Sequence, residues 1–271
     1  MKVSFSRKGF DSENGGQPNA ILPDGTLLVF PIPDEKEGVD SFSELRFRGR
    51  ALIEYIKDLK PNTKLTGDSL CHLDPDLVRD VKKRPEGWCP AFGQSNQSLS
   101  ELRNNNFGIG DLFLYFGWFK ETEFRNGCLL YKRGAPDLHL IYGYLQVESI
   151  LENIDAIPPG LEFHPHASKI NCRNSRDAIY LPTKQLSFDN RLPGASMLKY
   201  SPKLVLTAPN HSRSKWALPS FFDSIRIGHS PKQPENREYF QSPAKGQEMI
   251  WDADENLDSY DWLREICSII A

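Results

Sequence analysis

Two runs of the sequence are apolar on both faces of an extended chain, and they constrain the fold more than any other feature. Leu112–Phe119 and Leu138–Val147 carry apolar or aromatic side chains at nearly every position. Successive side chains of a strand point to opposite faces, so a strand of this kind is buried on both sides. The two runs therefore predict the centre of a sheet that is covered on both faces.

The connection between the two runs predicts how they pair. It contains Asn126-Gly127, a dipeptide typical of a tight hairpin turn. We expect the runs to pair antiparallel in a strongly curved sheet. Gly117 and Gly143, one inside each run, indicate a bend or a close approach of another backbone.

Turn-forming residues and two amphipathic segments complete the expected architecture. The chain of 271 residues contains 20 Pro and 19 Gly, which predicts many short elements and long ordered loops. Apolar side chains recur at helical spacing over residues 41–57 and 258–270, so helices are expected there. The predicted fold class is α+β, with a mixed, strongly curved, mainly antiparallel sheet or a barrel core, flanking helices and long ordered loops.

One compact domain over residues 1–271 is expected, because no shift in composition divides the chain. The best candidate for a weak boundary is residues 153–160, which contain Pro158-Pro159.

Composition excludes several classes of protein. The formal net charge of -3 provides no general basic field for holding a long nucleic acid. The longest strongly apolar run is under half of the ~20 residues that a membrane span needs. Five cysteines without a CxxC pair, together with an N-terminus that lacks an apolar signal core, indicate a reducing, cytoplasmic protein. No partner protein and no cofactor is indicated, since a dinucleotide-binding glycine fingerprint and a cysteine cluster are both absent.

A polar, glycine-containing loop directly follows the first expected strand, residues 2–6. Arg7 offers a planar fork and Lys8 a point charge for phosphate, and Asp11 is a candidate acid or base. An ordinary surface loop is the alternative. Arg213, in a second basic loop, is a further candidate for phosphate contact.

The segment Cys71-His72-Leu73-Asp74-Pro75-Asp76 is dense in acid–base groups. His72, Asp74 and Asp76 alternate, so they share one face of an extended chain and are candidate catalytic residues. In the alternative interpretation, Asp74 only caps a short helix that begins at Pro75. Gln94 is a further candidate for the catalytic site.

His164 and His166 form an H-x-H pair. On a strand both imidazoles would project to one side, as in many metal sites. The spacing also occurs by chance, and the sequence does not identify a third ligand. A metal-dependent hydrolase or nuclease would need an acidic residue within ligand distance of this pair.

Aromatic residues of the two apolar runs are either core side chains or platforms for a nucleobase. The candidates for stacking are Trp118, Tyr142 and Tyr144. The order of a helical turn, Gly-Asp, an aromatic strand and a second strand also resembles the core of PUA-like barrels of the ASCH and EVE types, which hold RNA or modified bases.

Longer motifs spread over nearly the whole chain resemble the third type of nucleotide modification associated domain. They are Ser6-Arg7-Lys8-Gly9-Phe10-Asp11-Ser12, Ile21-Leu22-Pro23-Asp24-Gly25, Cys71-His72-Leu73-Asp74-Pro75-Asp76, Ala91-Phe92-Gly93-Gln94, Gly110-Asp111-Leu112-Phe113-Leu114-Tyr115 and His139-Leu140-Ile141-Tyr142-Gly143-Tyr144. The resemblance implies a bacterial or phage protein that takes part in the modification of DNA bases. It implies no particular reaction and no catalytic residues.

Three functions follow from these observations. The first is an enzyme that modifies a nucleotide or a nucleic-acid base in a polar pocket built from loops at strand ends. The second is a non-catalytic, PUA-like reader of modified bases, and the third is the metal-dependent hydrolase or nuclease. For the enzyme, we expect the side chains of Arg7–Asp11 and His72–Asp76 to line one pocket. We also expect Arg7 or Arg213 to face the pocket that contains Asp11 or His72.

Overall fold

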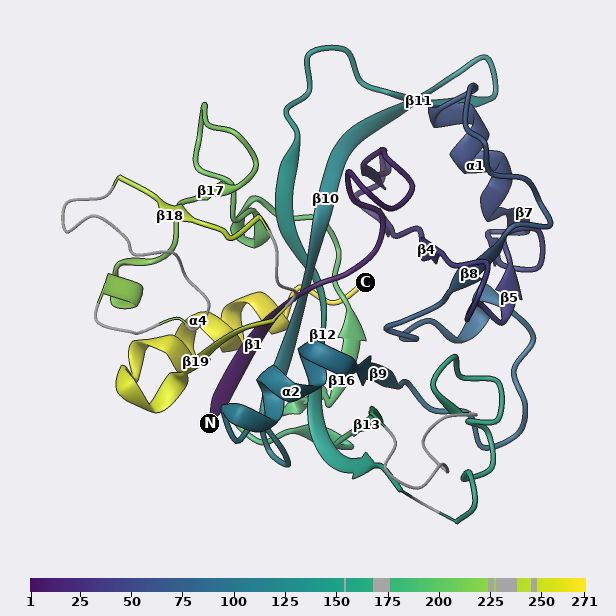
Figure 1. Ribbon diagram of the computed structural model, residues 1–271. Helices are drawn as coiled ribbons and strands as arrows, with labels where there is room; N and C mark the ends of the chain where they lie inside the picture. Colours follow the sequence, from purple (N-terminus) through teal and green to yellow (C-terminus); the bar gives the residue numbers. More distant parts are fainter. Residues whose placement is uncertain (154, 168–175, 224–226, 228–237, 245–247) are drawn as a thin grey trace.

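The computed structural model describes residues 1–153, 155–167, 176–223, 227, 238–244 and 248–271. Its centre is a mixed sheet with the strand order β19-β1-β10-β12-β13-β9 (Figure 1). The strands of this sheet are β1 (Lys2–Arg7), β9 (Phe92–Ser95), β10 (Leu112–Arg125), β12 (Leu138–Leu151), β13 (Asp177–Pro182) and β19 (Glu248–Asp252).

The two apolar runs form the central pair, as the sequence predicts. β10 and β12 pair antiparallel, and the register shifts between Tyr115 and Phe116. Both strands are longer than expected: β10 continues to Arg125 and β12 to Leu151. At its end β10 turns through Asn126-Gly127 into β11 (Cys128–Tyr131). The predicted α+β fold with a mainly antiparallel sheet is therefore confirmed, with β1 and β10 as one parallel pair.

The sheet curls, but its backbone ladder does not close into a barrel among the described strands. β19 and β9 are the two ends of the strand order, yet the amide of Gln94 on β9 donates a hydrogen bond to the carboxylate of Glu248 on β19, at 2.6 Å. The two edges thus meet through side chains instead of backbone hydrogen bonds. Of the two forms expected for the core, the described strands therefore adopt the curved mixed sheet and not the barrel.

In the described part of the chain, three helices pack around the sheet: α1 (Leu52–Leu59), α2 (Asn96–Asn104) and α4 (Asp258–Cys267). The predicted helix over 41–57 begins only at Leu52. Before it, Arg48 and Gly49 adopt positive φ angles and form the turn between β6 (Arg46–Phe47) and β7 (Arg50–Ala51). A left-handed turn interrupts a helix, so only the second half of the apolar pattern is helical.

Short strands extend or flank the sheet. They are β2 (Asn19–Ile21), β3 (Leu27–Leu28), β4 (Ile32–Pro33), β5 (Asp40–Ser41), β8 (Leu70–His72), β14 (Gln185–Leu186), β15 (Asp189–Pro193), β16 (Ala195–Met197), β17 (Lys215–Trp216) and β18 (Phe240–Gln241). Single 3-10 turns span Arg79–Val81, Pro202–Leu204, Ser220–Asp223 and Ala253–Glu255.

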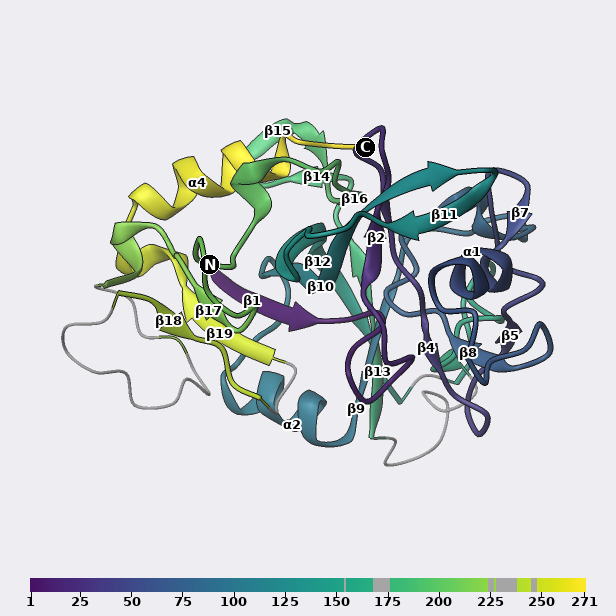
Figure 2. The same ribbon diagram turned by 90° about the horizontal axis from the view of Figure 1, so that it is seen from above.

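Both faces of the central strands are buried, in two different cores. Leu114 and Phe116 of β10 pack with Trp216 and with α4, whereas Phe113 and Tyr115 pack in a second core with Phe92 of β9. Figure 2 shows α4 on one side of the central strands and the group formed by α1, β5, β7 and β8 on another. Alternate side chains of the central strands thus face two different hydrophobic cores, as the sequence predicts.

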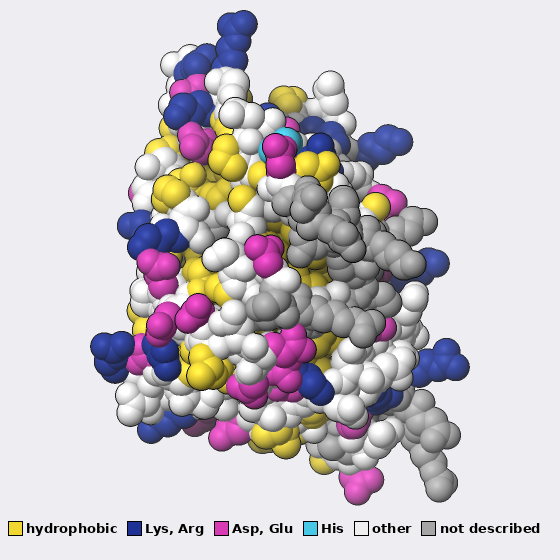
Figure 3. Space-filling model, turned by 90° about the vertical axis from the view of Figure 1, so that its left-hand side faces the viewer, with side chains coloured by type: hydrophobic (Ala, Val, Ile, Leu, Met, Phe, Trp, Pro, Cys, Tyr) yellow, Lys and Arg dark blue, Asp and Glu magenta, His cyan; other side chains and the backbone are white. Residues whose placement is uncertain are grey.

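The charged surface is mixed. On the side drawn in Figure 3, Lys and Arg side chains stand mostly at the margin, and Asp and Glu side chains gather toward the lower centre. None of the described helices is both long and apolar enough to cross a membrane.

Candidate functional site

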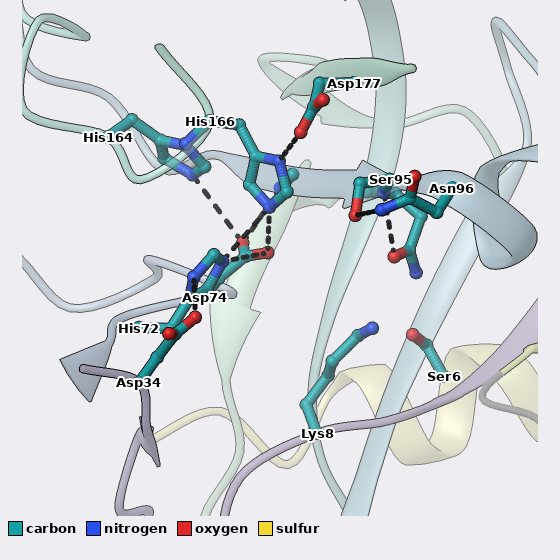
Figure 4. A network of polar contacts seen from close by, with 12 residues as sticks. Ser6, Lys8, Asp34, His72, Asp74, Ser95, Asn96, His164, His166 and Asp177 are labelled. Atoms are coloured by element: carbon teal, nitrogen blue, oxygen red, sulfur yellow. Dashed lines mark hydrogen bonds and ion pairs between the residues drawn. The ribbon is translucent and has the colours of Figure 1, made fainter. Parts of the chain in front are cut away.

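A buried cluster of three histidines and two aspartates lies beside the inner core of the sheet. His72 ends β8 and Asp74 follows two residues later, whereas His164 and His166 come from a turn-rich segment before β13. Figure 4 shows the three imidazole rings directed toward the Asp74 carboxylate, with Asp177 behind His166. The H-x-H pair is not on a strand as expected, but both rings still face the same carboxylate.

The Nε2 atoms of the histidines surround Asp74 at short range. The two Nε2 atoms of His72 and His166 are 3.1 Å apart. Asp74 Oδ2 lies 3.8 Å from His72 Nε2 and 3.6 Å from His166 Nε2, and Asp74 Oδ1 lies 3.6 Å from His164 Nε2. All four residues are largely buried, so the cluster concentrates ligand-type atoms away from bulk water.

Carboxylates and backbone groups fix the orientation of this cluster. Asp177 Oδ1 is 2.7 Å from His166 Nδ1, and this bond directs Nε2 of the same ring toward Asp74. The Gly93 amide donates to Asp74 Oδ1 at 2.8 Å. A carboxylate behind a histidine that presents its other nitrogen is the usual arrangement around ligating imidazoles.

Gly93 allows the His166 ring to lie against β9. A Cβ atom at this position would be 2.0 Å from His166 Cδ2, far inside van der Waals contact. The motif Ala91-Phe92-Gly93-Gln94 therefore contributes to the site through a missing side chain as well as through a backbone amide.

The charges of the cluster are strongly coupled. Burial alone would raise the pKa of Asp74, but the close contacts of its carboxylate with His164, His166 and His72 outweigh burial and hold that pKa well below its usual range. Burial lowers the pKa of His166, yet hydrogen bonds to Asp177 and Asp74 raise it overall, to about 9. Negative charge at the centre of the cluster thus attracts either protons or another cation.

The cluster has the donor set and the spacing of a transition-metal site. Nitrogen ligands at about 2.0–2.1 Å from a tetrahedral zinc ion lie about 3.3 Å from one another. The separations of 3.1–3.8 Å measured here bracket that value. His164 Nε2 is buried and has no hydrogen-bond partner within the described structure, as expected for an atom that awaits a ligand.

Asp76 belongs to a different environment from His72 and Asp74. Its carboxylate accepts a hydrogen bond from Arg84 Nη1 at 2.7 Å and from Trp88 Nε1 at 3.1 Å, and its backbone pairs with Ala91. His72, Asp74 and Asp76 therefore do not share one face as expected. Asp76 instead binds Arg84 and Trp88 of the following loop. Asp74 caps no helix, because only a 3-10 turn over Arg79–Val81 follows.

A second polar network fills the interior of the sheet next to the cluster. The Glu248 carboxylate accepts hydrogen bonds from Ser4 at 2.7 Å, Ser6 at 2.8 Å and Gln94 at 2.6 Å, and Lys8 Nζ is 3.5 Å away. Lys8 thus lies inside the sheet, beside Ser6 in Figure 4. Gln94 is one residue from Gly93, so β9 links the two networks.

A cavity of about 610 Å³ opens beside the histidine cluster, and Asp74 forms part of its wall. Tyr142 lines the same cavity, with its hydroxyl buried and without a hydrogen-bond partner among the described residues. The remaining wall is mainly apolar, with three arginines. These lining residues include Leu27, Val29, Leu77, Arg46, Arg48 and Arg79. We call it the Asp74 cavity.

A second cavity, of about 680 Å³, is lined by four of the other predicted site residues. Arg7, Asp11, Trp118 and Arg213 all line it, which confirms that an arginine faces the pocket of Asp11. We call it the Arg7 cavity. Asp74 is in the other cavity, so the expectation that Arg7–Asp11 and His72–Asp76 line one pocket is wrong. Of this first segment only Gly9 lines the Asp74 cavity, and Lys8 lies against Glu248 inside the sheet.

Tyr144 belongs to the hydrophobic core. It is fully buried, and its hydroxyl donates to the carbonyl of Pro193 at 3.1 Å. In this arrangement it has no face available for a base.

Asp34, Asp177 and Glu248 complete the two polar networks. Asp34 Oδ2 lies 3.7 Å from His72 Nδ1. Asp177 comes from a segment without a recognisable motif, so sequence reasoning does not find it. Asp34 ends Pro31-Ile32-Pro33-Asp34, a short motif of the same family resemblance that gives the carboxylate no chemical role. Tertiary pairing of β4 with β8 and of β13 with β9 brings both aspartates to the histidines.

The fold and the site together define an α+β protein with a buried histidine–carboxylate centre at the rim of a curled mixed sheet. The profile of the family described as Nucleotide modification associated domain 3 matches residues 2–252. The chain belongs to this family, which associates it with nucleotide modification. Comparison with curated proteins and with solved structures finds no match.

Proposed function

We propose that the protein is a metal-dependent enzyme that modifies a nucleotide or a nucleic-acid base. The observation that carries the proposal is the convergence of His72, His164 and His166 on Asp74. His72, Asp74 and His166 offer ligand atoms within 4.8 Å of one another, and they are supplied by two distant parts of the sequence. A buried group of this composition is typical of zinc, iron or manganese sites.

The residues around the centre suggest how a substrate would be handled. When bound, a divalent metal supplies Lewis-acid chemistry or activates a water molecule. Asp74 lies at the boundary between the centre and the Asp74 cavity, so a substrate in this cavity would meet the metal at that wall. The unpartnered hydroxyl of Tyr142 can donate a hydrogen bond to the substrate, and the apolar wall can hold a base.

Support for an enzyme therefore rests on the histidine–aspartate centre and not on Asp11. Asp11 Oδ1 accepts hydrogen bonds from the amides of Glu13 and Asn14, at 2.8 and 2.6 Å, and so shapes its own loop. The proposal unites two of the sequence-based functions, because the centre supplies the metal site and the family supplies the substrate class.

Metal analysis tests the centre directly. We expect about one equivalent of a transition metal in protein reconstituted with zinc, iron or manganese and then desalted. Asp74→Asn and His166→Ala are expected to lose most of it. His211→Ala is the matched control, since His211 is exposed and lines the Arg7 cavity. A folded wild-type protein that retains no metal would contradict the proposal, and so would variants that bind as much as the wild type.

A glycine substitution tests the packing on which the centre depends. Gly93→Ala should displace the His166 ring, because the added Cβ would lie 2.0 Å from Cδ2. We expect loss of bound metal together with a destabilisation of about 1–3 kcal/mol. Gly108→Ala is the control, since its Cβ would meet only Ile150 Cδ1, at 3.9 Å. Full metal content in a folded Gly93→Ala protein would contradict the assigned role of Gly93.

Activity can be sought in the same preparations. Metal-loaded protein is incubated with nucleoside monophosphates and with short DNA, and products are detected as mass changes of the released nucleosides. A modified nucleoside that forms with the wild type, and not with Asp74→Asn or after chelation, supports the proposal.

A further inference from the structure

The Arg7 cavity lies on the opposite face of the sheet from the Asp74 cavity and is built by strand register. Arg7 on β1 pairs with Phe116 on β10, and Trp118, two residues further on, pairs with His139 on β12. Residues two apart on a strand share a face, so these four side chains stand side by side. The Arg7 guanidinium lies 5.7 Å from the centre of the Phe116 ring, and the Phe116 and His139 rings are 5.4 Å apart.

Arg213, which comes from a separate loop, packs against the Trp118 end of this row of side chains. Its guanidinium lies 4.1 Å from the centre of the Trp118 ring, and it donates a hydrogen bond to the Ser12 hydroxyl. Thr207 anchors the loop by donating to the Arg213 carbonyl, at 3.1 Å. Arg213 and Arg7 thus enter one cavity from sequence positions that are 206 residues apart.

Arg7 and Arg213 form no ion pair with a described carboxylate, although Asp11, Glu13 and Asp137 also line the cavity. Arg7 is half-buried, and its hydrogen-bond partners among the described residues are neutral oxygens: the carbonyls of Ala244 and Pro243, at 3.1 and 2.5 Å, and the hydroxyl of Ser242. Asp11 is near, but backbone amides occupy its Oδ1 atom. A charge taken out of water without a partner is costly, and a bound anion would remove that cost.

His139 adds a neutral donor to the two cations. Trp216 Nε1 donates to His139 Nδ1 at 3.1 Å, so the hydrogen of the neutral ring is on Nε2. Burial, followed by the charges of Arg7 and Arg213, lowers the pKa of His139 to about 3. At neutral pH this ring can donate one hydrogen bond without adding a third positive charge.

We propose that the Arg7 cavity is a phosphate-binding site, in which Arg7 and Arg213 pair with the phosphate oxygens and His139 donates to one of them. Two planar guanidinium groups on one side of an oxyanion are suited to bidentate contact. The ligand is a phosphoester, either of a free nucleotide or of a nucleic-acid strand. This site is additional to the proposed metal centre and does not depend on it.

Phosphate binding can be measured by calorimetric titration with inorganic phosphate, a nucleoside monophosphate and a short single-stranded oligonucleotide. Arg213→Gln is the main variant, because Arg213 lies in a loop and not in a strand of the sheet, and Arg7→Gln is the second. Arg125→Gln is the matched control, since Arg125 is exposed at the end of β10 and lines neither cavity. We expect Arg213→Gln and Arg7→Gln each to weaken binding roughly 10- to 100-fold, the effect of losing a charged hydrogen bond, with Arg125→Gln unchanged.

The three ligands distinguish the source of the phosphate. Binding of the monophosphate that is lost in the variants assigns the site to a free nucleotide, and binding of the oligonucleotide alone assigns it to a strand. Absence of all binding by the wild type overturns the proposal, as do equal affinities of the wild type and both variants. Metal content measured on the same variants should stay at the wild-type level, so a failure here is separable from a failure of the metal centre.

Discussion

At the scale of single residues, the surroundings of His166 and of His139 shift the pKa of the two rings in opposite directions. His166 lies between Asp74 and Asp177, which favour its charged form, whereas His139 lies between two guanidinium groups and an indole, which favour its neutral form. A proton or a metal ion is therefore attracted to the first histidine and an anion to the surroundings of the second. In the proposed functions, histidine would thus serve as a cation ligand on one face of the sheet and as a neutral donor on the other.

The depressed pKa of His139 makes folding sensitive to acid. The ring has a pKa of about 3 in the folded chain and about 6.5 when unfolded, so between these values only the unfolded state binds the proton. Its contribution to stability is complete above the unfolded pKa and is lost as the pH falls toward 3. Besides Arg7 and Arg213, Asp137 lines this cavity, and its carboxylate accepts from Trp118 Nε1.

We expect the wild type to lose about 2 kcal/mol more free energy of unfolding than His139→Gln between pH 7 and pH 5. Glutamine retains an acceptor for Trp216 but does not titrate. Urea unfolding of both proteins in phosphate-free buffers gives the two differences. Equal losses would show that His139 is not kept neutral.

At the scale of elements, β9 joins the two polar networks because its residues alternate. Gly93 donates its amide to Asp74, and the next residue, Gln94, bonds to Glu248 on β19. The strand is only four residues long, yet it lines the histidine–aspartate centre and also holds the two edges of the curled sheet together. Consecutive residues of β9 therefore contribute to different polar networks.

Glu248 is expected to be the main polar support of this edge contact. Glu248→Ala removes the acceptor of hydrogen bonds from Ser4, Ser6 and Gln94 and the ion-pair partner of Lys8. Because these groups are buried, we expect a loss of about 3 kcal/mol or more in the free energy of unfolding. Chemical denaturation measures it. Glu152→Ala, which breaks the exposed pair with Arg103, should change stability little, and an equally small effect of Glu248→Ala would refute the assignment.

Sequence patterns determine some of these elements and not others. The antiparallel pair of β10 and β12 agrees with the apolar alternation of the two runs, so it is predictable, whereas Asn126-Gly127 forms the turn between β10 and β11. The motifs of His72, Asp74, His164 and His166 also mark ligand-type residues. Their meeting is not predictable, because it depends on the packing of the segment before β13 against β9. No local sequence pattern marks Asp177, although its carboxylate contacts His166. Asp11 lies in a recognisable motif, but its carboxylate accepts a hydrogen bond from its own loop.

At the scale of the whole molecule, the two ends of the chain share one sheet. β1 lies between β19 and β10, so residues 2–7 pair both with residues 248–252 and with the central strand. α4 packs on the core formed by β1 and β10. The candidate boundary at residues 153–160 falls between β12 and β13, which pair with each other. A loop between two paired strands does not separate domains.

We therefore expect cooperative unfolding of the whole chain as one unit. Strands from the start, middle and end of the sequence depend on the same two cores, so opening one part exposes the others. In scanning calorimetry the ratio of calorimetric to van't Hoff enthalpy should be about one. Cleavage near residue 155 should yield fragments that lose native circular dichroism once separated, because β12 and β13 would then be parted. A fragment of residues 1–153 that folds alone, or a second thermal transition in the intact chain, would show instead that the molecule consists of two domains.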